Sequence, residues 1–532
     1  MTRLSLAIVF ILSALSSFAQ EQKVWWVYFT DKQGSTFDPY TYFDPAAIER
    51  REKTGVSLYD YTDYPVSPVY LGKLSAVVDT VGYASRWMNA VSVVAGEEEI
   101  AQVRSFPFVK EVVLQGGFDW VPCSLPSRTP ADVAPVDGIS WQVREMQGEQ
   151  FAKHNVTGSG INICILDAGF WGVDTHESFA SLRYNNQIKA THNFISKDSS
   201  VYTRKTDHGT SVLSCIAGKD ETQSLGMAPG ANFFLGLIAK EYGNQYRAEE
   251  HYIAGVEWAD QKGAHIINIS GGPNENAYFP EDMDGKTSVI SFACKMAARK
   301  GILVVAAAGN NGEHWGERQL LPPAETDSVL SVTALGDSGF VASYSAVGPP
   351  PDFRRKPDIC APGDVLVAAH DKKGNEYAYS DGTSFSAPLV VGFAACLMQK
   401  YPEITAMGTI DSLHKCGHLY PYYDYAHGYG VPMAGYFYRE NYVPVKSFYL
   451  SRSDSSTVIF NVEPGADTLS GNVEDRLLFW NLTDAQGRII RYKVVDVSQK
   501  NITLIGAGDD AHLQHGLKLC AWYKNYYAEI DL

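Results

Sequence analysis

The chain has 532 residues, of which 45% are hydrophobic and 20% charged. This composition is that of a globular protein and excludes a disordered or fibrous chain. The length exceeds what a single hydrophobic core holds, so we expect about two to four domains. The formal net charge of −16 repels phosphate backbones, so no nucleic-acid partner is expected, and the same charge favours a soluble monomer.

The first residues have the pattern of a secretory signal peptide. Arg3 precedes the apolar run 4–15, and a small-x-small sequence ends at Ala19. That run is too short to span a bilayer as a stable helix, and no later run is long enough. We therefore expect removal of residues 1–19 and a secreted, periplasmic or cell-surface protein with no membrane span.

Residues 20–120 are predicted to form a small α+β unit. Strand-like runs at 24–30, 87–95 and 109–114 accompany the segment 97–104, which begins with three glutamates and places its apolar residues on one face. Acidic residues in the first turn stabilise a helix start.

The next segment, 121–139, is predicted to be an exposed linker. Four prolines lie between residues 121 and 137, and proline disfavours both helix and sheet. Exposed linkers are where proteolysis concentrates.

Residues 140–436 follow a different pattern. Apolar strand-like runs such as 161–166, 266–269 and 302–307 alternate with helical segments such as 247–262. Continuous apolar strands separated by helices predict an α/β domain with a mainly parallel sheet.

Beyond residue 440 the helical pattern fades. Runs such as 456–462, 476–480 and 489–497 have strand character and are separated by Gly, Asp and Asn turns. Residues 440–532 are therefore predicted to form a small β-sandwich-like domain.

The eight cysteines follow no metal-binding spacing. Several lie inside apolar runs, which favours buried free thiols over a disulfide framework, although an exported protein can form disulfides. Their positions are 123, 164, 215, 294, 360, 396, 416 and 520.

Three polar residues occupy the places where a parallel sheet gathers its active groups. Asp167 ends the apolar run 161–166, His208 precedes the helix-like segment 211–217, and Ser384 lies at the start of another helix. Active groups collect at the carboxyl ends of parallel strands. Each residue alone is more often a cap, a turn or a surface residue, so the prediction depends on their combination.

Together these groups have the composition of a hydrolytic triad. A serine is a weak nucleophile unless a base accepts its proton, and His208 is the candidate base and acid. Asp167 is the candidate for orienting the imidazole. The side-chain amide of Asn310, after another apolar strand, is a candidate donor to the tetrahedral oxyanion beside the Ser384 N–H.

Five separate segments resemble the subtilase family of serine peptidases, in the order in which that family has them. The resemblance covers about residues 140–435 and implies the three-layer subtilisin-like fold and endopeptidase activity on polypeptide substrates, with Asp167, His208 and Ser384 as the triad and Asn310 as the oxyanion donor. The segments are 161–170 (INICILDAGF), 208–218 (HGTSVLSCIAG), 268–272 (NISGG), 303–312 (LVVAAAGNNG) and 382–388 (GTSFSAP).

The same resemblance assigns a substrate-binding role to two short stretches. They are expected to line the pocket of the residue before the scissile bond and to pair with an extended substrate backbone. The residues are Ser270, Gly271, Gly272, Ala307, Ala308 and Gly309.

Two positions depart from the family pattern, and both concern the shape of the pocket. Leu213 stands where the family usually has a small residue, and Gly271 replaces a residue that is commonly larger and apolar. His176, near Asp167, is a rival base by position, but it lacks the Gly-Thr sequence and small-residue helix that follow His208.

Residues 20–120 resemble the inhibitory prosegment of this family. The resemblance implies that this unit assists folding, blocks the cleft with its C-terminal end and is then cut away within 121–139. A retained accessory domain is the alternative. The chemistry needs no cofactor; a structural calcium is common in the family, but no acidic loop here has a spacing that assigns ligands.

Two other functions remain open at this point. A catalytically silent subtilase fold acting as a binding or scaffold protein would have the same architecture. An esterase on a different α/β fold would have a Gly-x-Ser-x-Gly elbow with its serine before the acid and the histidine, and neither feature surrounds Ser384.

Overall fold

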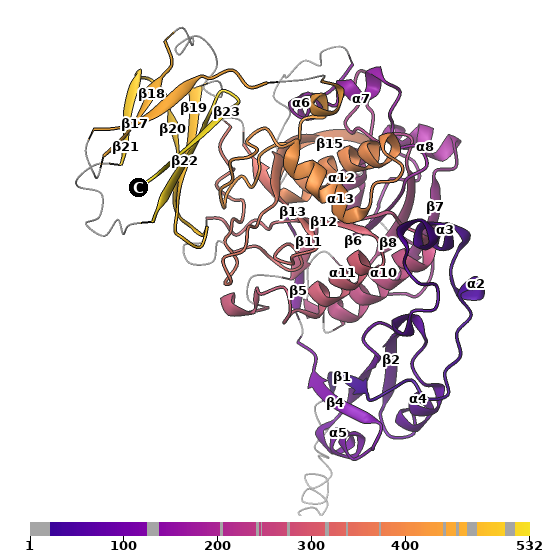
Figure 1. Ribbon diagram of the computed structural model, residues 1–532. Coiled ribbons are helices and arrows are strands. Elements are labelled where there is room, and N and C mark those ends of the chain that lie inside the picture. Colours follow the sequence, from indigo (N-terminus) through magenta and orange to yellow (C-terminus); the bar gives the residue numbers. More distant parts are fainter. Residues whose placement is uncertain are drawn as a thin grey trace, which may run out of the picture. The chain divides into compact units, whose positions relative to one another are not determined.

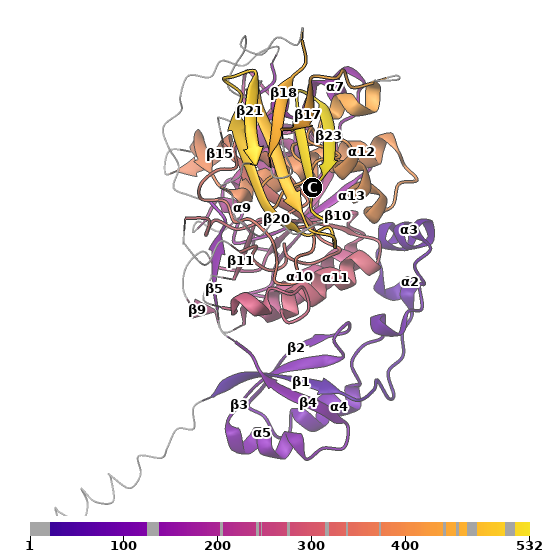
Figure 2. The ribbon, with the colours of Figure 1, turned by 60° about the vertical axis from the view of Figure 1, so that its left-hand side comes forward.

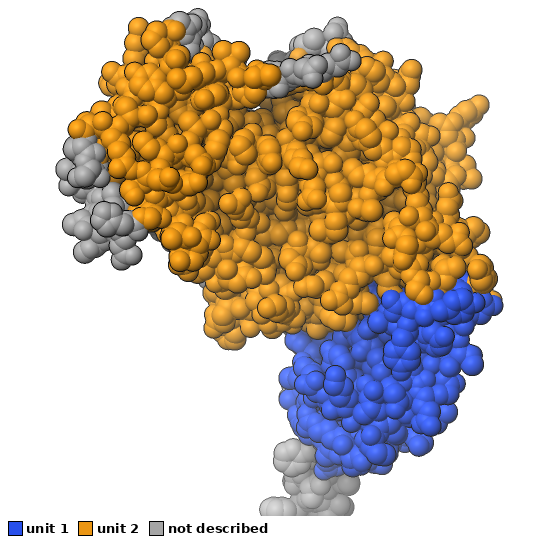
Figure 3. Space-filling view, viewed as in Figure 1, with its two compact units in different colours: residues 1–39, 59–117 blue, residues 40–58, 118–532 orange. Residues whose placement is uncertain are grey.

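The structure is a computed structural model, and it describes two compact units within the chain (Figure 3). The first contains residues up to 39 together with 59–117, and the second contains 40–58 together with 118–532. The expected signal peptide and most of the expected linker lie outside the described residues. The residues not described are 1–21, 117, 125–137, 203–205, 241–243, 246, 274–276, 314–318, 337–338, 372–373, 440–442, 454–456, 465–475 and 506–515.

The first unit is an antiparallel sheet with helices, as the α+β prediction requires. Its strands have the order β2-β3-β1-β4, and the aromatic and β-branched residues of the central strands share a buried core with Ile100 and Val103 of the helix α5. The elements are β1 (Lys23–Phe29), β2 (Thr80–Ser85), β3 (Ala90–Ala95), β4 (Val109–Leu114), α4 (Pro68–Leu74), α5 (Glu97–Arg104) and the 3₁₀ helix η1 (Tyr61–Asp63).

The second unit is built around a seven-stranded parallel sheet with the order β14-β13-β12-β10-β6-β8-β7. The central strands are buried over their whole length, which explains why they have no polar alternation. The strands are β6 (Asn162–Asp167), β7 (Ile188–Asn193), β8 (Asn232–Leu237), β10 (Ile266–Ile269), β12 (Leu303–Ala307), β13 (Leu330–Leu335) and β14 (Ile359–Pro362).

Two pairs of helices cover this sheet on opposite sides (Figure 1). The helix α9 (His208–Ala217) packs on α12 (Thr383–Lys400), and α10 (Ala248–Lys262) packs on α11 (Val289–Arg299). Residues 383–398 of α12 are all buried, as expected for a helix that is apolar on every side. The predicted three-layer α/β architecture is confirmed.

Shorter elements complete this domain. They are α2 (Pro39–Tyr42), α3 (Pro45–Thr54), α6 (Trp141–Glu145), α7 (Glu149–Lys153), η2 (Glu177–Phe179), α8 (Ala180–Tyr184), η3 (Pro280–Asp282), β15 (Asp364–Asp371), β16 (Gly374–Asp381), α13 (Ala406–Lys415) and η4 (Ala434–Tyr438).

A separate three-stranded sheet has the order β11-β5-β9 (Figure 2). The strand β5 (Phe118–Pro122) pairs antiparallel with β11 (Gly271–Pro273) on one side and with β9 (Asn244–Gln245) on the other. Residues 121 and 122, expected in an exposed linker, therefore belong to a paired strand.

The C-terminal residues form two antiparallel sheets that share one core, as predicted. The sheets have the orders β17-β18-β21 and β20-β19-β22-β23, and Phe448 and Phe460 of the first pack with Trp480 and Tyr523 of the second. The strands are β17 (Phe448–Arg452), β18 (Val458–Val462), β19 (Leu477–Thr483), β20 (Ile489–Asp496), β21 (Asn501–Ile505), β22 (Lys518–Tyr523) and β23 (Tyr526–Asp531).

The cysteines confirm one further expectation, and the helices add one finding. All eight cysteines are buried free thiols. Over the part of the chain that the structure describes, no helix combines the length and the apolar character that crossing a membrane requires.

Candidate active site

Asp167 and His208 meet at the carboxyl edge of the parallel sheet. Asp167 is the last residue of β6 and is fully buried, and His208 is the first residue of α9. The Asp167 Oδ1 atom lies 2.8 Å from the Nδ1 atom of His208 and accepts the backbone N–H of Ala168 at 2.7 Å. The carboxylate thus fixes the plane of the imidazole and holds a proton on Nδ1, which leaves Nε2 able to accept one.

Ser384 lies in the same site, in the first turn of α12. The ring of the next residue, Phe385, has its centroid 6.0 Å from that of His208. The Ser384 hydroxyl donates a hydrogen bond to the Ser270 carbonyl, and the Ser270 hydroxyl donates to the Ser384 carbonyl at 2.8 Å. In this arrangement the Ser384 hydroxyl points at a backbone carbonyl.

The amide of Asn310 is held by Thr383, the first residue of α12. Its Oδ1 atom accepts the Thr383 N–H at 3.1 Å and the Thr383 hydroxyl at 3.0 Å. Because both contacts are donors to Oδ1, the orientation of the amide is determined. The Nδ2 atom is buried and has no hydrogen-bond partner among the described residues, so it is available to donate to an oxygen that enters the site.

The chain's own β5 occupies this site as an extended peptide. Val121 is opposite Gly272, and Pro122 is opposite Gly271. The next residue, Cys123, donates its N–H to the Ser270 carbonyl at 3.2 Å and accepts the Ser384 N–H on its carbonyl oxygen at 2.8 Å. The Cys123 carbonyl thus lies at the helix N-terminus where an attacked carbonyl would be stabilised.

The thiol of Cys123 is enclosed. Its side chain is 3% exposed, and burial raises its pKa to about 12. A thiol in this state is neutral and behaves as a small apolar group.

Trp120 fills a space that exists because residue 271 is a glycine. The indole is 1% exposed, and its ring centroid is 5.8 Å from that of His208 in an edge-on arrangement. A Cβ atom on Gly271 would lie 2.1 Å from Cζ2 of Trp120, which no side chain tolerates. The Gly271 carbonyl is held by the Tyr252 hydroxyl at 2.8 Å, so the strand cannot withdraw easily.

The two predicted substrate-binding stretches lie at the ends of the adjacent strands β10 and β12, since Ile269 pairs with Ala306. Gly271 and Gly272 pair with β5, and the Ser270 carbonyl accepts the N–H of Cys123, the residue after β5. The stretch 307–309 lies at the end of β12, next to Asn310, where the Gly309 N–H donates to the Thr383 hydroxyl at 3.2 Å.

His176 lies apart from this constellation and has a structural environment. It is fully buried, accepts the Ser178 N–H on Nδ1 at 3.1 Å, and its Nε2 atom lies 3.0 Å from the Glu376 carbonyl oxygen. Leu213, the other departure from the family pattern, is fully buried in the core.

Sequence reasoning missed Thr383, Trp120 and Cys123 as members of the site. Thr383 stood inside the quoted GTSFSAP segment but had no assigned role. Trp120 and Cys123 carry no local signal, because their place depends on pairing with β11, about 150 positions further along the chain.

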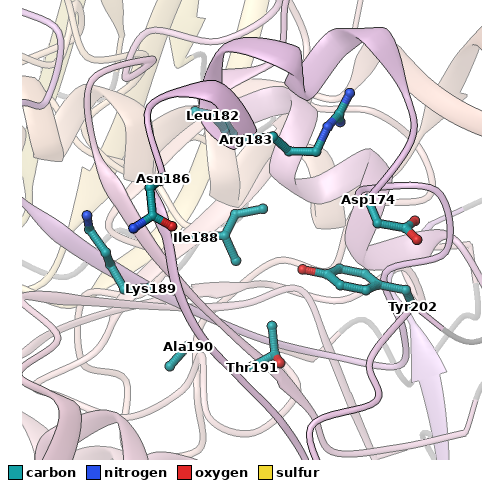
Figure 4. Close-up of a pocket in the computed structure, with 9 residues that line it drawn as sticks. All are labelled: Asp174, Leu182, Arg183, Asn186, Ile188, Lys189, Ala190, Thr191 and Tyr202. Atoms are coloured by element: carbon teal, nitrogen blue, oxygen red, sulfur yellow. The ribbon is translucent and has the colours of Figure 1, made fainter.

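A pocket of about 380 Å³ lies elsewhere, beside α8 and β7 (Figure 4). Its lining includes Asp174, Arg183 and Lys189 and none of the candidate catalytic residues. No group of three or more His, Cys, Asp or Glu residues suited to a metal ion occurs within the described ranges.

Comparisons with known proteins identify the family. A model described as the subtilase family matches residues 158–412, and one described as the peptidase S8 propeptide domain of Bacteroidota matches residues 24–121. Subtilisin DY of Bacillus licheniformis is 30% identical over 271 residues, which are 50% of this chain and 87% of that protein. The thermostable alkaline protease of Halalkalibacterium halodurans is 30% identical over 276 residues, 52% of this chain and 67% of its own.

A solved structure has the same fold over most of the chain. It is fervidolysin of Fervidobacterium pennivorans, described as a keratinolytic enzyme related to subtilisin. The TM-score is 0.58 at 16% identity, and the match covers 96% of this chain and 90% of that one. Fold, catalytic motifs and relatives agree: the chain belongs to the subtilase family of serine peptidases and carries that family's propeptide domain.

Proposed function

We propose that this protein is an exported serine endopeptidase whose triad is Asp167, His208 and Ser384. The Ser384 hydroxyl attacks the substrate carbonyl carbon while His208 accepts its proton on Nε2. Asp167 orients the imidazole and stabilises its cation. The Ser384 N–H and the Asn310 Nδ2 group donate to the oxyanion. Subtilases need no cofactor for catalysis, and each of these steps uses only groups of the chain.

The observation that carries this proposal is the position of the Cys123 carbonyl on the Ser384 N–H, 2.8 Å away. A substrate presents its scissile carbonyl to the nucleophile in this way. The bond that we propose is cut first is therefore the one between Cys123 and Ser124, within the chain itself.

The self-cleavage proceeds through an acyl-enzyme. Attack of Ser384 Oγ on the Cys123 carbonyl forms a tetrahedral adduct, which collapses with loss of the Ser124 amine. His208 donates to that amine the proton it took from Ser384. Water then hydrolyses the Cys123 ester, His208 removes the water proton, and the products are a Cys123 carboxylate and free Ser384.

The way in which β5 is bound also indicates the class of polypeptide that the cleft accepts. Trp120 lies three residues before Cys123, in the space that Gly271 leaves open. We propose that substrates are extended segments with a bulky aromatic residue three positions before the scissile residue and a small apolar one at the scissile position.

The remaining partners follow from the same arrangement. While β5 is in the cleft, substrates are excluded, so we propose that the prosegment acts as an intramolecular inhibitor. The basic start and short apolar run at residues 1–19 support export through a secretory signal. The charge of −16 supports a soluble monomer without nucleic-acid partners.

Active-site labelling tests this function against a catalytically silent subtilase fold. Purified, processed protein is treated with a fluorophosphonate probe, which reacts with activated serines. We expect wild type to be labelled and Ser384→Ala not to be; His208→Ala, which keeps the serine, should lose most of the labelling. A wild-type protein that is processed and folded yet unlabelled would favour the silent scaffold.

A further inference from the structure

The two proposed oxyanion donors belong to different parts of the catalytic domain. Asn310 lies in the loop after β12, and Ser384 lies in the first turn of α12. An oxyanion hole works only when both donors lie within about 2.7–3.1 Å of the same oxygen. The distance between the loop and the turn therefore bears directly on the chemistry. Thr383 supplies one link between them, and Tyr344 supplies a second.

Tyr344 bonds to both sides of this gap. Its carbonyl oxygen accepts the N–H of Gly312, in the loop that carries Asn310, at 2.8 Å. Its side-chain hydroxyl accepts the N–H of Gly382, two residues before Ser384, at 3.1 Å. One residue thus holds the loop with its backbone and the turn with its side chain.

The segment that carries Tyr344 is tied to the end of β12. The Ala346 N–H donates to the Gly309 carbonyl at 2.9 Å. Gly312 approaches this segment so closely that a Cβ atom there would lie 2.2 Å from the Ser345 carbonyl oxygen. Tyr344 itself is 8% exposed. The backbone of residues 344–346 is therefore bound to the Asn310 loop, and the tyrosine hydroxyl reaches across to the turn before α12.

The hydroxyl has a closely fitted place beside that turn. A Cβ atom on Gly363 would lie 2.5 Å from the Tyr344 hydroxyl oxygen, and the Gly363 carbonyl accepts the same Gly382 N–H at 3.0 Å. Gly382 lies against the proposed oxyanion site. A Cβ atom on it would lie 3.1 Å from Asn310 Nδ2 and 2.3 Å from the Cys123 carbonyl oxygen. A shift of Gly382 would therefore change the site where the oxyanion forms.

We propose that Tyr344 is a positioning residue for the serine peptidase reaction. Its hydroxyl sets the place of Gly382, and through it the distance between the Ser384 N–H and the Asn310 amide. This inference rests on the proposed function. Tyr344 neither donates to the oxyanion nor transfers a proton; it acts through the two groups that donate. A small misplacement of those groups weakens bonds that form fully only in the transition state.

Tyr344→Phe tests the role of the hydroxyl, because it removes a single oxygen atom. The Gly382 N–H keeps the Gly363 carbonyl as an acceptor, so the turn loses one of its two bonds. Full-length chains are folded at about pH 5, where a histidine base is protonated, and are then shifted to about pH 8. Gel analysis gives the first-order rate constant of self-cleavage after Cys123, in which no separate binding step enters. We expect Tyr344→Phe to lower it about three- to tenfold, the usual effect of one hydrogen bond.

A double-mutant cycle with Asn310→Ala separates positioning from packing. When the Ser384 N–H is the remaining donor, the distance between two donors no longer matters. Tyr344→Phe should then lower the rate constant less than about twofold in the Asn310→Ala background. A tyrosine that only fills space would cost the same factor in both backgrounds.

Hydrogen exchange in Ser384→Ala chains gives a second measurement, which does not depend on cleavage. Mass spectrometry of the peptide that contains residues 382–384 follows the Gly382 amide. We expect it to exchange at least about threefold faster in Tyr344→Phe, because one of its two acceptors is gone. Unchanged exchange would contradict the proposed hold on the turn.

Tyr425→Phe is the matched control. The Tyr425 hydroxyl also bonds a backbone group, the Phe353 carbonyl, at 3.0 Å, and the residue is 3% exposed. Its loss should leave the rate of self-cleavage unchanged. Equal rates in wild type and Tyr344→Phe, or equal factors in the two backgrounds of the cycle, would overturn the inference while leaving the proposed function intact. A wild-type chain that never cleaves itself would instead contradict the proposed function, and this inference would fall with it.

Discussion

The proposed catalytic groups of this enzyme are held by neighbours that have no proposed part in the chemistry. Thr383 fixes the amide of Asn310 through two hydrogen bonds, and the Ala168 N–H fixes the carboxylate of Asp167. Such preorganisation matters because a donor already aimed at the developing charge costs no reorganisation when the reaction occurs. Two substitutions at this scale separate donation from positioning.

Asn310→Ala removes the proposed side-chain oxyanion donor. We expect kcat to fall by about 10²–10³ with little change in KM, because the donor acts on the transition state more than on bound substrate. Thr383→Val keeps the N–H bond to the amide but removes the hydroxyl, which bonds the amide and accepts the Gly309 N–H. It should cost about tenfold, and Thr383→Ser should restore most of that loss. Steady-state kinetics on a peptide substrate measures all three. An Asn310→Ala enzyme with unchanged kcat would contradict the assignment.

Gly271→Leu tests the fit between the cleft and Trp120. The added side chain overlaps the position of the indole, since even a Cβ atom would lie 2.1 Å from Cζ2. We expect slow self-processing in this variant and near-normal processing in Gly271→Leu/Trp120→Ala. Time-resolved gel analysis compares the processing of wild type, Gly271→Leu, Trp120→Ala and the double variant. If Gly271→Leu and the double variant lose the same amount of processing rate, the substitution has disturbed the strand β11 and not the fit of the indole.

At the scale of elements, local signals were read correctly and non-local ones were not. Asp167, His208, Ser384 and Asn310 could be proposed from the sequence because each follows or opens an element with a strong local pattern. The strand β9 has two residues and exists as a strand only through β5, and the packing of α3 on α10 was not anticipated. Residues 40–58 contain a good helix, but nothing in them indicates that Arg50 and Arg51 pair with Asp260, about 200 positions away.

A buried carboxyl group beside α11 provides a pH test at this scale. Glu325 is fully buried, and its Oε1 atom lies 2.5 Å from the Ser291 hydroxyl of α11. Burial raises its pKa from the ordinary value of 4.5 to about 7. Between those two pH values the folded chain holds a proton that the unfolded chain has lost, so stability falls as the pH rises through this range.

Glu325→Gln should remove this dependence. We expect the free energy of unfolding of the variant, relative to that of the parent, to be about 3 kcal/mol higher at pH 8 than at pH 5. Each pKa unit corresponds to about 1.4 kcal/mol. Urea unfolding at the two pH values, in a Ser384→Ala background that prevents autolysis, measures it. Glu281→Gln, at an exposed position, is the control and should show no such difference. If the free energies of unfolding of variant and parent differ by the same amount at both pH values, the account is contradicted.

At the scale of the whole second unit, the C-terminal sheets are attached to the catalytic domain through aromatic side chains. Phe479 and Trp522 pack with Leu419 and Tyr422 in one buried cluster. The strand pattern of residues 440–532 predicted the sheets but not this attachment, because the outer face of β19 alternates with the inner one and carries the polar Asn481 and Thr483 beside Leu477 and Phe479. All seven residues of β19 are buried, which indicates contacts on both faces.

Phe479→Ala tests that attachment. Phe479 is 3% exposed and lies 5.2 Å from the His427 ring of the catalytic domain. We expect the free energy of unfolding to fall by about 3–5 kcal/mol, the usual cost of replacing a buried phenylalanine by alanine. Calorimetry should show the transition of both domains shifting. Tyr449→Ala, at a side chain that is 41% exposed, should change little. Destabilisation confined to the C-terminal domain would mean that the two domains unfold independently.

The position of the first cut tests the central claim most directly. Freshly expressed wild type and Ser384→Ala are compared by peptide mass spectrometry of the C-terminal residue of the severed prosegment, which later trimming of residues 125–137 does not alter. We predict a fragment ending at Cys123 in wild type and an uncut chain in Ser384→Ala. A wild-type fragment with a different end, or the same fragment from Ser384→Ala, would contradict the account.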